Sequence, residues 1–203
     1  MAPMPELSTS TSLLLAAFPP ELAGLDLNPP PGWRVACVGV GALAAAVATT
    51  RLIAEFQPKR VLFVGTCGAL DSRLKIGDFI SASEAIATSL DEREGRTYRP
   101  EIERTRWTST WTLPFPAHQV VVPPGITKTA EGALAFSQLA AAEHLELTGV
   151  FAACHAANIP VAAVLAVANR VGPNAHGEWL ANHAHLSQTL IASLTPLGLL
   201  NRA

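Results

Sequence analysis

The chain has 203 residues, of which 49% are apolar and 15% charged, and its formal net charge is −2. This length suits one domain with a single core, and the near-neutral charge gives no electrostatic reason to expect binding to nucleic acid or to an anionic membrane surface. The first twelve residues lack a basic signal-peptide segment, and no apolar run is long enough to span a membrane. We therefore expect a cytoplasmic protein that contacts neither nucleic acid nor membrane.

The chain begins with a polar tail, residues 1–11, which is rich in Ser and Thr and is predicted to be disordered. Residues 12–203 are predicted to form one domain. Its first element is a short buried strand at Leu13–Ala17, followed by Phe18–Leu22, where two prolines favour a helix start or a tight loop.

The segment from Trp33 to Ala85 predicts a strand, a helix and two further strands: Val35–Val38, Ala42–Phe56, Arg60–Val64 and Lys75–Ile80. A strand, a helix and a strand within about thirty residues indicate a right-handed βαβ unit in a largely parallel sheet. Glycine clusters follow the first and second of these strands. Ligands bind beyond the carboxyl ends of parallel strands, so both clusters are expected to lie near a ligand.

The second half starts with a charged segment, Asp91–Arg106, which holds ten of the thirty charged residues and is expected to be solvated, with a lid or a subunit contact as the alternative. The later elements predicted from apolar patterning are the strands Gln119–Val122 and Ile159–Val167, helices at Glu131–Ala142 and Glu143–Asn158, and a final helix from about Gly177.

Two motifs carry a family resemblance. Val38-Gly39-Val40-Gly41 is followed by alanines, and Val64-Gly65-Thr66-Cys67-Gly68-Ala69-Leu70 precedes Leu74-Lys75-Ile76-Gly77-Asp78. From Leu13 to Leu194 the chain resembles the purine nucleoside phosphorylase and nucleosidase superfamily, and within it the futalosine hydrolases. The resemblance implies an α/β fold, a three-layer α/β/α sandwich around a mixed, largely parallel sheet, with Thr66, Cys67 and Gly68 at the substrate.

The resemblance also implies roles for two glutamates. Glu21 matches the residue that orients the hydrolytic water, although it also fits an exposed glutamate in a first helical turn. Glu146 matches the residue that accepts hydrogen bonds from the ribose hydroxyls, and Leu145 the apolar residue under the sugar. An ordinary helix N-terminal position is the alternative for Glu146. His144 replaces a frequent acidic residue of the family and is interpreted as a surface side chain or a contact to the 5′ end.

Asn169 is the main departure from the adenine-specific members, which have an aspartate after the last core strand. An amide donates a hydrogen bond to purine N7 and interacts with a 6-oxo group, but it supplies no proton as a carboxylic acid does. In having Asn at this position, the chain resembles the phosphorylases for inosine and guanosine, and more closely the futalosine hydrolases, whose substrate carries hypoxanthine. The alternative is that Asn169 only caps the turn after the strand.

Water rather than phosphate is the expected nucleophile, because no arginine lies in Phe18–Leu22 or Gly65–Leu70, and Arg73 is interpreted as a loop residue. The three cysteines have no metal-type spacing, and His183 and His185 point to different faces of a helix, so neither a metal nor another cofactor is expected.

Three hypotheses follow for the function. The first is a nucleosidase that releases hypoxanthine from futalosine in menaquinone biosynthesis. The second is another purine nucleosidase or phosphorylase, of the inosine or methylthioadenosine type. The third is a catalytically silent nucleoside-binding homologue. Because the family is typically oligomeric, a homo-oligomer is expected.

Overall fold

The fold is built on one mixed sheet in a computed structural model that describes residues 11–200. The predicted tail lies outside these residues, apart from Thr11. In chain order, the strands are β1 (Ser12–Ala16), β2 (Trp33–Cys37), β3 (Val61–Ala69), β4 (Phe79–Ala87), β5 (Arg106–Thr108), β6 (Ala117–Val122), β7 (Ala142–Glu143) and β8 (Val161–Arg170). The helices are the 3₁₀ helix η1 (Pro19–Leu22), α1 (Ala42–Phe56), α2 (Leu90–Arg93), α3 (Ala130–Ser137), α4 (Leu147–Ala156) and α5 (Ala175–Leu194).

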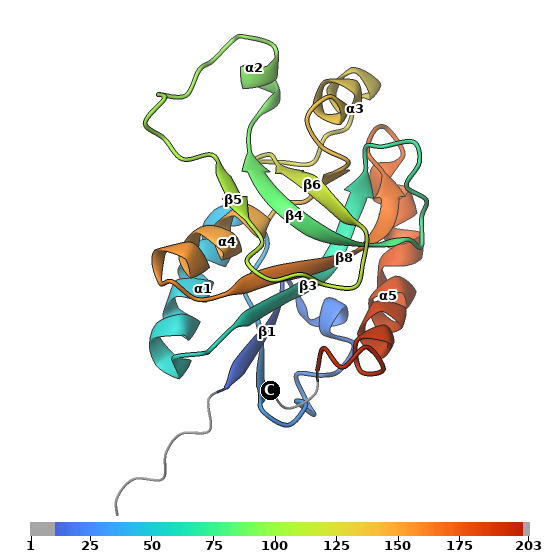
Figure 1. Ribbon diagram of the computed structural model, residues 1–203. Helices are drawn as coiled ribbons and strands as arrows, with labels where there is room; N and C mark the ends of the chain where they lie inside the picture. The colour runs from blue at the N-terminus through green and yellow to red at the C-terminus, as the bar shows by residue number, and fades with distance from the viewer. Residues whose placement is uncertain (1–10, 201–203) are drawn as a thin grey trace, which may run out of the picture.

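Strand β3 is the centre of the sheet, as Figure 1 shows. The strand order is β2-β1-β3-β7-β6-β4-β5, and β8 pairs with both β3 and β4. Strands β3, β7, β6, β4 and β8 therefore close into a ring. The long β3–β8 pair is parallel, with a register shift between Cys67 and Gly68, at the end that forms the site described below.

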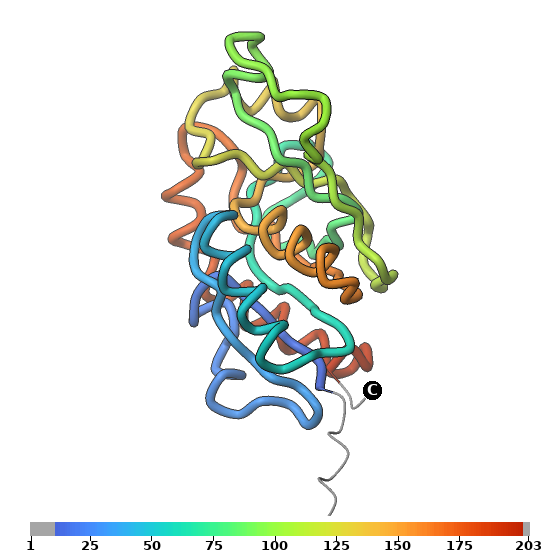
Figure 2. Tube along the Cα trace, turned by 90° about the vertical axis from the view of Figure 1, so that its left-hand side faces the viewer, coloured from blue at the N-terminus to red at the C-terminus, as the bar shows by residue number. Residues whose placement is uncertain are grey.

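Helices cover both faces of the sheet, which confirms the predicted three-layer α/β architecture. On one face α1 and α4 lie side by side (Figure 2) and pack Leu52, Val150 and Phe151 onto the strands. On the other face α5 and η1 bury leucines against β1, β3 and β8. No helix formed by residues 11–200 has both the length and the apolar character that crossing a bilayer requires.

The predicted N-terminal half is largely confirmed, because α1 has the predicted bounds and β1 is shifted by one residue. The strand predicted to end at Val64 is too short, because β3 continues through the second glycine cluster to Ala69. One detail of the βαβ unit differs. Strand β1 pairs in parallel with both β2 and β3, so it lies between the two strands that α1 connects. The third predicted strand starts too early, because residues 75–78 form a turn in which Lys75 N–H donates to Asp78 Oδ2 (2.7 Å).

Both helices predicted between 131 and 158 are too long. Helix α3 ends at Ser137, and residues 142–143 instead form β7, which pairs with β3 and β6. Helix α4 starts only at Leu147. Strand β7 has only two residues, so it is too short for periodicity to distinguish it from the neighbouring helices.

The charged segment is mostly exposed, which fits a solvated excursion. Helix α2 lies at its start and is preceded by a capping box. The Ser89 side chain accepts a hydrogen bond from Glu92 N–H, and the Glu92 side chain accepts one from Ser89 N–H. Ion pairs join Arg96 to Asp91 and Arg99 to Glu103 on its surface.

Candidate active site

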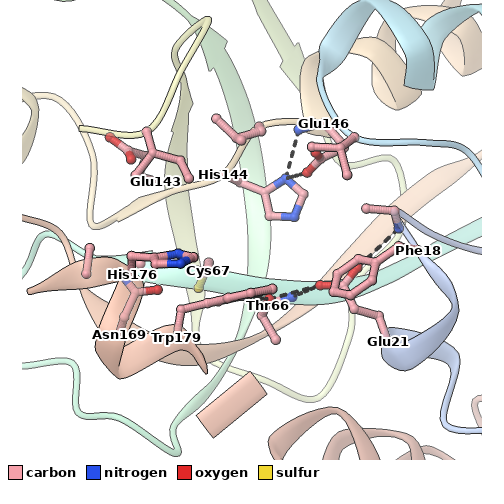
Figure 3. Close-up of a pocket in the computed structure, with 16 residues that line it drawn as sticks. Phe18, Glu21, Thr66, Cys67, Glu143, His144, Glu146, Asn169, His176 and Trp179 are labelled. Atoms are coloured by element: carbon pink, nitrogen blue, oxygen red, sulfur yellow. Dashed lines mark hydrogen bonds and ion pairs between the residues drawn. The ribbon is translucent and has the colours of Figure 1, made fainter. Parts of the chain in front are cut away.

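A cavity of about 390 Å³ lies at the carboxyl ends of β1, β3 and β8. Its wall contains all seven residues expected at the site: Glu21, Thr66, Cys67, Gly68, Leu145, Glu146 and Asn169. They come from η1, from β3, from the segment between β7 and α4, and from β8. Residues far apart in the chain therefore meet at one place (Figure 3).

Glu21 lies at one end of this cavity and is only 3% exposed, so its interpretation as a surface glutamate is wrong. Its Oε1 accepts hydrogen bonds from Thr66 N–H (2.8 Å) and Thr66 Oγ1 (2.9 Å), and its Oε2 accepts from Ala17 N–H (3.1 Å). Burial raises the pKa of Glu21 to about 7, although the bonds from Thr66 oppose the rise. At neutral pH this carboxyl therefore exchanges a proton easily.

Thr66 is held in a chain of hydrogen bonds that starts on α5. Trp179 Nε1 donates to Thr66 Oγ1 (3.1 Å), and an indole nitrogen can only donate. The threonine hydroxyl proton is therefore directed to Glu21. Thr66 was expected to contact substrate, but its N–H and its hydroxyl are both engaged by Glu21. This chain fixes the orientation of the carboxylate.

Glu146 lies at the start of α4, and it is 5% exposed. Its Oε1 accepts from Gly41 N–H (2.7 Å), so the first glycine cluster contacts this carboxylate. Oε2 lies 3.2 Å from His144 Nδ1. Glu146 is the N-cap residue of α4, but its side chain does not cap the helix and lines the cavity instead. Leu145, also in the wall, is half-buried.

Asn169 approaches the cavity from β8, next to Gly68 of β3. Its Nδ2 donates one proton to Arg170 O (3.0 Å), which leaves the second amide proton and Oδ1 available. A Cβ at Gly68 would lie 2.9 Å from this Nδ2 and 2.8 Å from Val171 Cγ2. Glycine at position 68 is therefore required for the amide to lie across the strand end.

Cys67 is the remaining β3 residue in the wall, and burial raises the pKa of its thiol. A thiol in such surroundings stays protonated and is a poor nucleophile. Within residues 11–200 no group of three His, Cys, Asp or Glu side chains is arranged to hold a metal ion.

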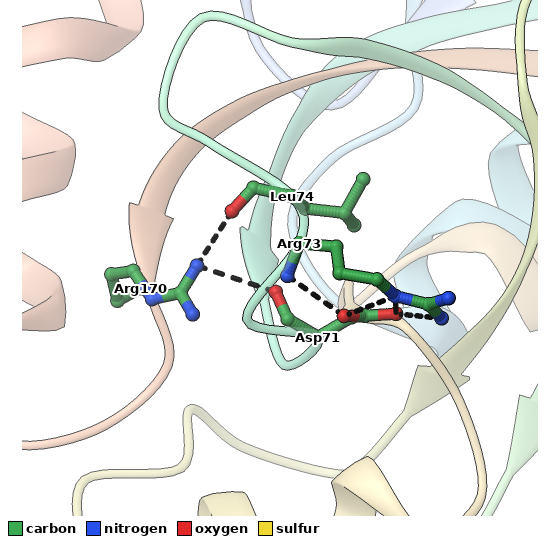
Figure 4. A network of polar contacts seen from close by, with 4 residues as sticks. All are labelled: Asp71, Arg73, Leu74 and Arg170. Atoms are coloured by element: carbon green, nitrogen blue, oxygen red, sulfur yellow. Dashed lines mark hydrogen bonds and ion pairs between the residues drawn. The ribbon is translucent and has the colours of Figure 1, made fainter.

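Two arginines near the end of β3, Arg73 and Arg170, do not line the cavity. Arg170 Nη1 donates to Leu74 O (2.6 Å) and Asp71 O (3.3 Å), so it holds the loop after β3 (Figure 4). Arg73 forms an exposed ion pair with Asp71 (2.6 Å). Neither Arg nor Lys is among the described residues that line the cavity.

Sequence reasoning missed several residues of the wall. Phe18, Glu143, His176 and Trp179 line it, and His144 does so too. The surface interpretation of His144 is wrong, because the residue is 5% exposed. For Trp179 the signal was its place on the apolar face of α5. Nothing comparable marked Glu143, whose Oε1 accepts from Thr127 N–H (3.0 Å).

The fold resembles that of solved nucleosidases. The 5′-methylthioadenosine/S-adenosylhomocysteine nucleosidase of Helicobacter pylori has a TM-score of 0.81 and 16% identity, over 95% of this chain and 99% of that one. The futalosine hydrolase of Helicobacter pylori also has a TM-score of 0.81, with 17% identity over 94% of this chain and 97% of that one. At such identities the likeness establishes the fold class alone.

The sequence establishes the family. The model of the Phosphorylase superfamily matches residues 33–195, and the chain belongs to this family. Curated relatives match shorter segments. The 5′-methylthioadenosine/S-adenosylhomocysteine nucleosidase of Staphylococcus haemolyticus is 36% identical over 53 residues, which are 26% of this chain and 23% of that protein. That of Psychromonas ingrahamii is 44% identical over 46 residues, 23% of this chain and 20% of that protein. The match thus spans less than a quarter of the length of these relatives.

Proposed function

We propose that this protein is a purine nucleosidase that hydrolyses the N-glycosidic bond of a 6-oxopurine nucleoside, with futalosine as its preferred substrate. The reaction would release hypoxanthine, as in menaquinone biosynthesis. The observation that carries the proposal is the meeting of two buried carboxylates, Glu21 and Glu146, with the amide of Asn169 in one cavity. These are the groups that cleavage of a ribosyl–purine bond requires.

In the transition state, the C1′–N9 bond breaks while the sugar gains positive charge and the purine gains negative charge. Glu146 accepts hydrogen bonds from the ribose hydroxyls, and its negative charge favours the cationic sugar. Asn169 donates a hydrogen bond from its free amide N–H to the leaving base, and the departing purine anion takes up a proton from solvent. Water forms the new bond to C1′ and transfers its proton to ionised Glu21, whose pKa of about 7 suits a general base near neutral pH.

Hydrolysis is favoured over phosphorolysis by the charges around the cavity. A phosphate dianion beside the buried carboxylates Glu21 and Glu146 needs cationic partners, and the described wall offers no Arg or Lys. Arg73 and Arg170 are engaged elsewhere. Water, which is neutral, has no such requirement.

The choice of base rests on Asn169. Nδ2 already donates one proton to Arg170 O, and its free proton donates to N7 and the neighbouring 6-oxo oxygen, which are both acceptors. In adenine the 6-amino group is a donor, so the amide N–H would face another donor, at a cost of about 1–3 kcal/mol for an unpaired buried group.

A second candidate is a nucleosidase for methylthioadenosine or S-adenosylhomocysteine. It is favoured by the similarity to curated nucleosidases of this type and to one such solved structure. A homologue that binds nucleosides without cleaving them is the third. The test is a chromatographic screen for free base with futalosine, inosine and methylthioadenosine, each with and without phosphate. Hypoxanthine release that does not depend on phosphate supports the proposal. Preferential adenine release would support the second candidate, and no release from any substrate the third.

We further propose a homo-oligomer. Val40, Leu43 and Val47 expose apolar side chains along the start of α1, and Val40 and the exposed Ile126 also line the cavity. A partner that covers this surface would bury it and narrow the cavity entrance. A monomer in light scattering at micromolar concentration would contradict this.

A further inference from the structure

His144 is a buried residue of the cavity to which the mechanism above gives no role. Its backbone N–H donates to Val121 O (2.9 Å), and its ring meets Phe63 edge-on, with 5.3 Å between the ring centres. The side chain is 2% exposed and lies between the carboxylates of Glu146 and Glu21 (Figure 3). A buried imidazole in this position can contact the reacting groups.

The hydrogen bond at Nδ1 fixes which ring nitrogen has the proton. Glu146 N–H donates to His144 Nδ1 (3.1 Å), and the direction of a backbone N–H cannot change by side-chain rotation. Nδ1 is therefore the acceptor, although Glu146 Oε2 lies 3.2 Å from it. Burial lowers the pKa of His144, while the Glu146 carboxylate opposes this, so the ring is neutral near pH 7. A neutral ring that accepts at Nδ1 donates at Nε2.

The donor Nε2 and the Glu21 carboxylate meet above Gly65 of β3. A Cβ at Gly65 would lie 3.3 Å from His144 Nε2 and 3.3 Å from Glu21 Oε1. The two atoms are thus separated by no more than twice this distance. One water molecule with two hydrogen bonds of about 2.8 Å each spans up to about 5.6 Å, a separation that lies within this upper limit. The same Cβ position lies 3.0 Å from Phe63 Cε1, so the absence of a side chain at Gly65 leaves room beside these three groups.

We propose that His144 is a positioning residue for the nucleophilic water, a role that rests on the proposed hydrolytic function. Nε2–H donates to the water oxygen. The water donates to the carboxylate of Glu21, which accepts two hydrogen bonds from Thr66 at Oε1 and one from Ala17 N–H at Oε2. These two bonds fix the orientation of the water and leave a lone pair for attack on C1′. When the O–C1′ bond forms and the C1′–N9 bond breaks, the water proton passes to Glu21.

The hydrogen bond from Glu146 N–H to His144 Nδ1 also links the water site to the sugar site. His144 Nδ1 is held by the main chain of Glu146, whose carboxylate is proposed to hold the ribose. The distance between the sugar and the water is thereby set by one short segment of chain, residues 144–146.

The test compares His144→Phe, which keeps a flat ring without donors, with His144→Gln, whose amide nitrogen can reach the Nε2 position. His118→Phe is the matched control, because His118 lies outside this cavity. We expect His144→Phe to lower kcat by about 10²–10³-fold, the usual effect of losing one donor at the reacting centre, with KM changed less than threefold. His144→Gln should recover at least tenfold, and His118→Phe should match the wild type.

Two further readouts separate positioning from a purely structural role. In water–methanol mixtures, His144→Phe should form more methyl glycoside relative to free sugar than the wild type, because it no longer selects the water. Nitrogen-15 NMR of the wild type should show the proton on Nε2. A proton on Nδ1, an unchanged product ratio, or a raised KM with unchanged kcat would overturn the inference. If the wild type cleaves no nucleoside, both the proposed function and this inference are wrong. If the wild type is active and His144→Phe has the same kcat, only this inference is wrong.

Discussion

Replacement of Glu21 by Gln tests both the chemistry and the energetics of the site. In the native protein, burial raises the pKa of this carboxyl from 4.5 to about 7. At 1.36 kcal/mol per pKa unit, ionising it in the folded protein costs about 3 kcal/mol more than in the unfolded chain. Glutamine cannot ionise, so the variant lacks this cost.

The sign of the pH dependence follows from proton binding. Between pH 4.5 and 7 the folded protein holds a proton on Glu21 that the unfolded chain has released. This contribution to stability is therefore full at pH values below 4.5 and is lost as the pH rises through 7. When the pH is raised from 5 to 8, the unfolding free energy of Glu21→Gln relative to the wild type should increase by about 2–3 kcal/mol. This increase is most of the contribution expected from the raised pKa. At all pH values, Glu21→Gln should also lose about 1–3 kcal/mol of folding stability, because its amide NH₂ would face the N–H donors of Ala17 or Thr66.

The measurement is urea unfolding of both proteins at several pH values, combined with steady-state kinetics. Glu21→Gln should lower kcat by at least about 10²-fold while KM changes little, because the shape of the cavity is kept. In the wild type, kcat/KM should fall as the pH drops through about 7, where Glu21 takes up its proton. A stability difference that does not change with pH would refute the raised pKa, and an active Glu21→Gln would refute its role as the base.

Other substitutions test the remaining groups. Asn169→Asp should shift the ratio of kcat/KM toward adenine nucleosides by about 10–100-fold, measured by competing inosine against adenosine; an unchanged ratio would mean that Asn169 does not recognise the base. Glu146→Gln should raise KM for ribonucleosides by about tenfold or more, because charge-assisted hydrogen bonds to the sugar are lost; equal KM values in both proteins would exclude this contact. Trp179→Phe removes the donor to Thr66 Oγ1 and should lower stability by about 1 kcal/mol with a modest loss of kcat, as urea unfolding and kinetics can show. If Trp179→Phe changes neither stability nor kcat, the hydrogen-bond chain from Trp179 through Thr66 to Glu21 has no energetic role.

The sequence was most informative where local chemistry decides the structure. Helix α1 was predicted with its observed bounds, because an alanine-rich run without Gly or Pro lies between two breaks. The predicted site residues were also brought together. Glu21, Thr66, Cys67, Gly68 and Asn169 lie at or just after the ends of β1, β3 and β8, which are parallel and end at one edge. Leu145 and Glu146 follow β7, which is antiparallel to β3.

What the sequence did not reveal depends on contacts between distant segments. Strand β7 has only two residues and exists through its pairing with β3 and β6, so no local pattern marks it. The burial of His144 follows from that pairing, because the chain leaves β7 directly into the cavity. The raised pKa of Glu21 likewise reflects burial beneath residues that are distant in sequence, which composition does not show.

The central claim is that water cleaves the glycosidic bond in this cavity, and isotope transfer tests it most directly. The reaction is run in ¹⁸O-labelled water with a 6-oxopurine nucleoside and phosphate present, and the products are examined by mass spectrometry. The account predicts one ¹⁸O atom in the released sugar and none in the purine, at a rate that falls with Glu21→Gln. A sugar 1-phosphate without the label, or no cleavage at all, would contradict it.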